Sequence, residues 1–143
     1  MVGEDARTQP LARALAAVSD EKRFACAYLY GSRATGRAGP SSDWDVAIFL
    51  GRNANHRTRF ELDLAGRLEE LSGVRPIDVR VVDDAPLMVR GRILTEGILL
   101  YSGNEDERVR IERDTRIRYF DFKPVAERSF EEYLESTAGD EGA

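Results

Sequence analysis

The sequence predicts an α/β fold in which a mixed sheet of about four strands is backed by helices. Short runs of β-branched and aromatic residues alternate along the chain with segments whose apolar residues recur at helical spacing. Glycine and proline mark the junctions, most clearly in the glycine-rich turn between the first two predicted strands. The 143 residues suit one domain with a real hydrophobic core.

The first third of the chain contains a helix and two strands. Pro10 lies in the first turn of the helix, and Leu11, Leu15 and Val18 form its apolar stripe. The elements that follow are a strand at 24–30, a short helical turn at 32–36 and a strand at 44–50.

The rest of the chain alternates helices with strands and ends in helices. A helix at 56–72 stops at Gly73, and its apolar face is predicted to be Phe60, Leu64, Leu68 and Leu71. The next elements are a strand at 77–82, a helix at 86–96, a strand at 98–101, a very charged helix at 104–120 and a last helix at 125–134. In the helix at 104–120, the predicted apolar side is Val109, Ile111, Ile117 and Phe120.

Charge divides the chain into a core and an extension. Residues 1–103 hold 14 acids and 14 bases, whereas residues 104–143 hold 12 acids and 7 bases, so the net charge of −5 comes from the second part. We expect a core at 1–103, a helical extension at 104–136 that provides a partner surface, and a loose tail at 137–143. The absence of a basic stripe argues against a processive polymerase or other binding to extended nucleic acid.

Cysteine usage and the first residues indicate a cytoplasmic protein. Cys26 is the only cysteine, which excludes an internal disulfide, and its place in an apolar strand predicts a packed thiol. The acidic start of the chain does not fit a secretory signal, and no apolar run approaches the length of a membrane span. With His56 as the only histidine, a zinc site is not expected.

A compact constellation of polar residues surrounds the first turn. Gly31-Ser32 follows the first strand, and after ten residues Asp43-x-Asp45 opens the second. A strand has a period of two, so Asp43 and Asp45 point to one face, where their carboxylates suit Mg²⁺. The glycine turn offers backbone N–H groups to a phosphate, and Ser32 adds a hydroxyl. These parts suit in-line attack on a nucleotide phosphorus.

Asp78 is the third candidate acid, near the start of the strand at 77–82. It is either a solvent-facing acid of an edge strand or, if this strand lies beside the second one, a neighbour of Asp43 and Asp45. In the second case it would be a third metal ligand and the general base for the incoming hydroxyl.

The Gly-Ser and Asp-x-Asp spacing is similar to the signature of the nucleotidyltransferase superfamily with a DNA polymerase β-like fold. Within it, the chain resembles the minimal nucleotidyltransferase (MNT) antitoxins of HEPN–MNT toxin–antitoxin systems. Resemblance to this branch rests on small size, on the segment Glu96 to Tyr101, and on the arginine-rich helix that leads to Tyr119, Phe122 and Pro124.

The resemblance implies a Mg²⁺-dependent transfer of AMP from ATP to a tyrosine hydroxyl of a partner HEPN RNase toxin. Asp43, Asp45 and Asp78 would hold the metal, with two ions expected, and Asp78 would accept the hydroxyl proton. Gly31 and Ser32 would cradle the phosphates. Arg33 and Arg37 would neutralise the departing pyrophosphate, unless they are only surface residues.

Two other functions remain open at this point. The chain could be a non-catalytic antitoxin that neutralises its toxin by direct binding in a hetero-oligomer. It could also be a small-molecule nucleotidyltransferase of the aminoglycoside-resistance kind, although such enzymes usually carry a further substrate-binding domain.

Overall fold

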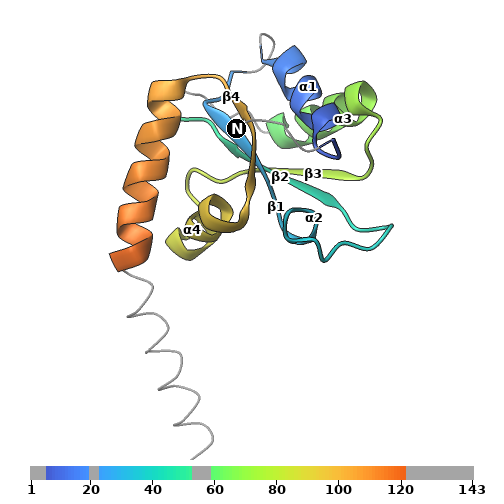
Figure 1. Ribbon diagram of the computed structural model, residues 1–143. Helices are drawn as coiled ribbons and strands as arrows, with labels where there is room; N and C mark the ends of the chain where they lie inside the picture. The colour runs from blue at the N-terminus through green and yellow to red at the C-terminus, as the bar shows by residue number, and fades with distance from the viewer. Residues whose placement is uncertain (1–5, 20–22, 53–58, 122–143) are drawn as a thin grey trace, which may run out of the picture.

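A four-stranded mixed sheet forms the centre of the molecule (Figure 1). The computed structural model describes residues 6–19, 23–52 and 59–121. The strands, in the spatial order β3-β2-β1-β4, are β1 Cys26–Tyr30, β2 Trp44–Phe49, β3 Ile77–Val81 and β4 Ile98–Ser102. β1 runs antiparallel to both β2 and β4, whereas β2 and β3 are parallel. The predicted fold class and the four predicted strands are therefore confirmed.

Helices cover both faces of this sheet. They are α1 Gln9–Val18, α2 Ser32–Thr35, α3 Phe60–Ser72, α4 Leu87–Glu96 and an unlabelled helix at 105–121, orange in Figure 1. α1 and α3 pack on one face, and α4 lies with helix 105–121 on the other. None of the helices in the described ranges combines the length and apolar character needed to cross a bilayer. The helix predicted at 125–134 and the tail lie outside the described residues.

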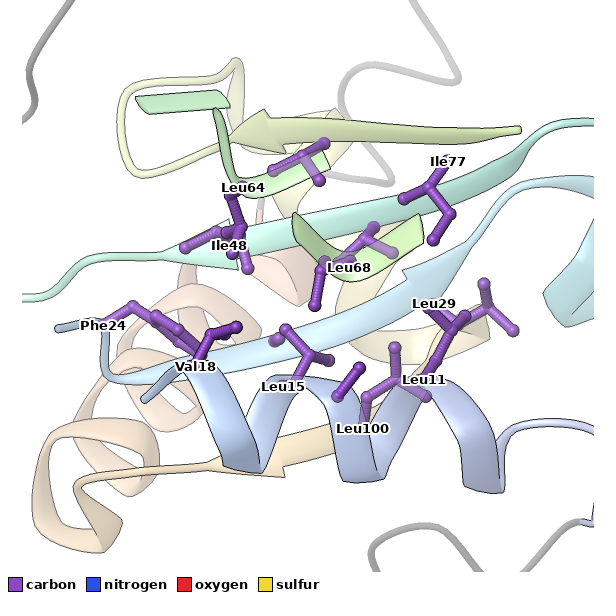
Figure 2. Close-up of a cluster of buried hydrophobic side chains, with 14 residues drawn as sticks. Leu11, Leu15, Val18, Phe24, Leu29, Ile48, Leu64, Leu68, Ile77 and Leu100 are labelled. Atoms are coloured by element: carbon purple, nitrogen blue, oxygen red, sulfur yellow. The ribbon is translucent and has the colours of Figure 1, made fainter. Parts of the chain in front are cut away.

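The larger core fills the space between the sheet and the pair α1 and α3 (Figure 2). Leu11 and Leu15 of α1 and Leu64 and Leu68 of α3 are fully buried there against Leu29 of β1. Each buried leucine contributes about 2 kcal/mol through removal of apolar surface from water. Leu71 departs from the prediction: it is 42% exposed, because the helix turns this position away from the sheet. This core fixes the strands that carry the candidate site.

A smaller core on the other sheet face contains Cys26, Tyr28, Phe49 and Ile93. Because burial raises the pKa of the Cys26 thiol to about 12, almost no thiolate exists at neutral pH. We expect Cys26 of the native chain to stay unmodified by a thiol reagent such as DTNB and to react once guanidinium chloride unfolds the protein. Fast stoichiometric labelling of the native chain would contradict the packed arrangement.

Helix 105–121 buries only one residue of its predicted apolar side, Ile111. Its inward residues are Ile111, Thr115 and Tyr119, whereas Val109, Ile117 and Phe120 are about half exposed. Where the helix meets the sheet, the contact is polar. The Tyr28 hydroxyl of β1 donates a hydrogen bond to Glu112 of the helix, and Glu112 also accepts one from Arg108 Nη1 at 2.8 Å. At the other end, the Tyr119 ring lies against Gly91 of α4. The missing side chain at Gly91 and the Glu112 contact, rather than apolar spacing, therefore select the packed face.

Two helical glycines make a matched pair for testing this contact. A Cβ atom at Gly91 would overlap the Tyr119 ring, whereas one at the exposed Gly66 of α3 would meet no atom within 4 Å. We expect Gly66→Ala to stabilise the protein by about 0.5–1 kcal/mol through helix propensity. Gly91→Ala should lower the free energy of unfolding despite the same propensity gain, by about 1–3 kcal/mol. Urea unfolding of both variants measures this, and equal effects would contradict the packing of Tyr119 on α4.

Candidate active site

The turn after β1 depends on a glycine. Gly31 has φ 73° and ψ −156°, a backbone conformation that is essentially restricted to glycine. Its carbonyl accepts hydrogen bonds from the N–H groups of Ala34 and Thr35 at 3.1 and 3.2 Å, which starts α2. A Cβ atom at Gly31 would lie 2.5 Å from Oδ2 of Asp45. The glycine therefore permits both the turn and the close approach of the Asp45 carboxylate to the backbone.

Sheet register brings the predicted acids to one place. Asp45 of β2 lies opposite Asp78 of the parallel neighbour β3, so both side chains point to the same face. Asp43, two residues before Asp45, is exposed just ahead of β2. The pKa of Asp45 is raised, first by partial burial and then by the charges of Asp78 and Asp43. The alternative in which Asp78 lies beside the second strand is thus the observed one, and the three carboxylates repel one another.

Arg80 also belongs to this cluster, although it was not among the residues predicted from the sequence. Its Nε donates a hydrogen bond to Asp78 Oδ2 at 3.2 Å, and this ion pair raises the pKa of the guanidinium. The signal that could have found it was present: Arg80 follows Asp78 by two residues in a strand and so shares its face. The pair is largely exposed, with 64% of the Arg80 side chain accessible.

The three carboxylates are chemically suitable ligands for a hard divalent cation. Asp45 and Asp78 supply oxygen ligands from adjacent strands, and their mutual repulsion would be relieved by a positive ion. Within residues 6–19, 23–52 and 59–121, however, no three histidine, cysteine or carboxylate side chains already converge on a metal position. The donor set is appropriate for Mg²⁺, while Arg80 is the cation that Asp78 contacts in this structure.

An open cavity of about 430 Å³ lies beside the glycine turn. Gly31, Ser32 and Arg37 line one side, and α4 forms the opposite wall with Val89, Arg92, Ile93 and Glu96. The volume is in the range of small-molecule and cofactor sites. Two arginines beside a backbone turn suit an anionic ligand, and the two apolar α4 residues suit a flat organic group. The contribution of α4 was not predicted, because the sequence shows no pattern that places this helix across the turn.

Arg33 is placed differently from the other predicted residues. Its guanidinium donates to the Ser42 carbonyl at 2.9 Å from Nη2 and stacks over the Trp44 ring at 4.4 Å. It does not line the cavity that Gly31, Ser32 and Arg37 share. Arg33 thus stabilises the loop that precedes Asp43 and Asp45.

A larger cavity of about 550 Å³ opens at the opposite end of the sheet. It is lined by residues around Phe24, Leu50 and Tyr101, and it contains none of the predicted site residues. By volume alone, this larger cavity would be the better candidate for the functional site. We place the candidate site at the smaller cavity, since the glycine turn lines it and the Asp45 carboxylate lies beside that turn, although the three carboxylates themselves do not line the cavity.

Comparisons with known proteins agree with this geometry. The sequence model of the family described as "Polymerase beta, Nucleotidyltransferase" matches residues 15–106. A search of curated proteins found no match. Solved structures that share the fold include the following two. A chain of a toxin–antitoxin complex with AMP-PNP is 16% identical with a TM-score of 0.66, and the alignment covers 86% of this chain and 98% of that one. A chain from a complex of a tri-AMPylated Shewanella oneidensis HEPN toxin with its MNT antitoxin is 15% identical with a TM-score of 0.63, covering 89% and 98%.

The family match includes the glycine turn and all three acids, and the solved structures reproduce the arrangement of the sheet and helices. The chain belongs to the polymerase β nucleotidyltransferase family.

Proposed function

We propose that this protein is an antitoxin that silences a HEPN RNase toxin by transferring AMP from ATP to a tyrosine hydroxyl of the toxin. One observation carries the proposal: the Gly31 turn lines a cavity of about 430 Å³ and has the Asp45 carboxylate beside its backbone, with Asp78 opposite Asp45. The similarity in fold to complexes of an MNT antitoxin with an AMPylated HEPN toxin supports this substrate class. We expect the reaction to take place in the cytoplasm.

The nucleotide would bind along the cavity beside α2. Backbone N–H groups after Gly31 and the Ser32 hydroxyl would hold phosphate oxygens, and Arg37 with Arg92 would neutralise the leaving pyrophosphate. Val89 and Ile93 of α4 would contact the ribose or base. Mg²⁺, held by Asp43, Asp45 and Asp78, would supply neutralisation of charge at the reacting phosphate.

The acceptor would enter from the β3 side. In-line displacement requires the attacking oxygen and the leaving pyrophosphate on opposite sides of the α-phosphorus. With the pyrophosphate beside Gly31, the tyrosine hydroxyl approaches Asp78, which takes its proton. The new bond joins the tyrosine oxygen to the α-phosphorus, and the bond from that phosphorus to the bridging oxygen breaks. β3 is the edge strand of the described sheet, which leaves room for a protein acceptor.

Position-specific labelling of ATP tests the reaction class. We expect radioactive phosphorus at the α position to become covalently attached to the toxin, and phosphorus at the γ position to appear only in pyrophosphate. This result separates nucleotidyl transfer from phosphoryl transfer, because a kinase would move only the γ label. Attachment of the γ label, or of neither label to a toxin that is nonetheless inhibited, would contradict the proposal.

A further inference from the structure

Tyr30 connects the cavity with the carboxylates. It is the last residue of β1, and it lines the cavity together with Gly31 and residues of α4. In the sheet it lies opposite Asp45, and Asp45 lies opposite Asp78, so the three residues form one row across β1, β2 and β3. Directly opposite residues point to the same face, and in an antiparallel pair their Cβ atoms are about 4.5–5.5 Å apart. Tyr30 is thus the member of this row that also lines the cavity.

The Tyr30 hydroxyl is available to a ligand. Tyr28, two residues earlier on the same face of β1, donates its hydroxyl hydrogen to Glu112. The hydroxyl of the partly buried Tyr30, by contrast, makes no hydrogen bond within the part of the chain that the structure describes. Burial, and after it the charge of Asp45, raises the pKa of this phenol, so the hydroxyl keeps its proton at neutral pH. A partly buried O–H group without a protein acceptor is a donor that a bound anion can satisfy.

We propose that the Tyr30 hydroxyl donates a hydrogen bond to a non-bridging oxygen of the α-phosphate of ATP and stabilises the charge on this oxygen during transfer. The inference rests on the proposed function and adds a catalytic residue to it. With the pyrophosphate beside Gly31 and the metal ligands at Asp45 and Asp78, the α-phosphorus has to lie between them. Tyr30 precedes Gly31 in the chain and lies opposite Asp45, so it borders this position. A preorganised donor strengthens its bond as charge develops, and Tyr30 keeps its proton throughout.

Removal of the hydroxyl tests the role of Tyr30. Tyr30→Phe keeps the ring at the cavity and removes only the donor. With toxin, ATP and Mg²⁺ present, we expect the rate of pyrophosphate release at saturating ATP to fall by about 10- to 100-fold, with a smaller change in KM. Tyr101→Phe, which removes a hydroxyl at the opposite end of the sheet, is the matched control and should leave the rate unchanged.

Sulfur substitution in the nucleotide identifies the atom that Tyr30 contacts. The two diastereomers of ATP with sulfur at the α-phosphorus each replace one non-bridging oxygen, and sulfur is the weaker hydrogen-bond acceptor. With wild type, the diastereomer whose sulfur faces Tyr30 loses this bond. With Tyr30→Phe the bond is absent for every nucleotide. We therefore expect the slowing caused by sulfur to shrink by about tenfold for one diastereomer and to stay unchanged for the other.

The outcomes separate this inference from the proposed function. If wild type attaches no AMP to the toxin, the proposed function fails and the inference fails with it. If wild type transfers AMP and Tyr30→Phe is equally fast, or slows ATP and both sulfur analogues by one common factor, only the role of Tyr30 is overturned. Because a loss of fold also slows all three nucleotides by one factor, it cannot produce the selective change expected for one diastereomer.

Discussion

Replacing Asp43 and Asp45 together by asparagine is expected to slow AMP transfer by about a thousandfold or more while the chain remains folded. Asparagine has nearly the same shape as aspartate, so the glycine turn and the strand register should persist. What disappears is the charge that would hold Mg²⁺ at the reacting phosphate. The initial rate of pyrophosphate release in the presence of toxin measures the effect. Asp84→Asn, in the exposed turn before α4, is the matched control and should leave the rate unchanged.

Asp45→Asn alone should raise thermal stability at neutral pH. Burial and the neighbouring carboxylates raise the pKa of Asp45, so ionised Asp45 is less favourable in the folded chain than in the unfolded chain. This penalty is present at neutral pH and disappears as the pH falls towards the usual range of an aspartate, about 4. Asp45→Asn should therefore melt at a higher temperature than wild type near pH 7, with the difference shrinking in acid. A loss of stability at neutral pH would show that Asp45 is not under the repulsion described here.

Gly31→Ala is expected to have the second largest effect, on both stability and transfer. A Cβ atom would lie 2.5 Å from Asp45 Oδ2, and alanine rarely adopts φ 73° with ψ −156°. We expect a loss of more than about 2 kcal/mol in the free energy of unfolding. The displaced carboxylate should slow transfer by about a hundredfold in the population that remains folded, since small misplacements at a reacting centre cost that much.

Gly36 provides the matched control for this position. It also has a positive φ, 78°, but a Cβ atom there would meet no atom within 4 Å. Gly36→Ala should cost about 1 kcal/mol of conformational strain and leave transfer nearly intact. Urea unfolding measures the strain that each alanine introduces into the turn. The rate of pyrophosphate release measures the effect of displacing the Asp45 carboxylate. If both alanine variants lose activity equally, the turn conformation matters and the contact of Gly31 with Asp45 does not.

Strand periodicity was sufficient to predict most of the acid cluster. The period of two places Asp43 and Asp45 on one face, and Asp78 stood out as an acid near the start of an apolar strand. What the sequence left open was whether Asp78 lies beside Asp45, because strand order depends on how the helices cross the sheet. The observed parallel pairing of β2 with β3 resolves this alternative. The catalytic roles of these residues stay predictions.

The errors and omissions have a common cause in long-range packing. Of the predicted apolar side of helix 105–121 only Ile111 is buried, because Gly91 lets Tyr119 approach α4, which no local spacing reveals. The α4 wall of the cavity was missed for the same reason. Arg33 was predicted either to neutralise the pyrophosphate or to be a surface residue; in the structure the Ser42 carbonyl accepts its hydrogen bonds, and its role in phosphate binding stays a prediction. Such contacts depend on which loops and helices meet in space.

The catalytic role of the carboxylates is tested by the intact mass of the toxin after incubation with ATP and Mg²⁺, using wild type and the Asp43→Asn/Asp45→Asn variant. We expect mass increases of whole AMP units with wild type and none with the variant, although the variant still binds the toxin. An unchanged mass with wild type, together with suppressed RNase activity, would contradict the catalytic account and leave an antitoxin that acts by contact.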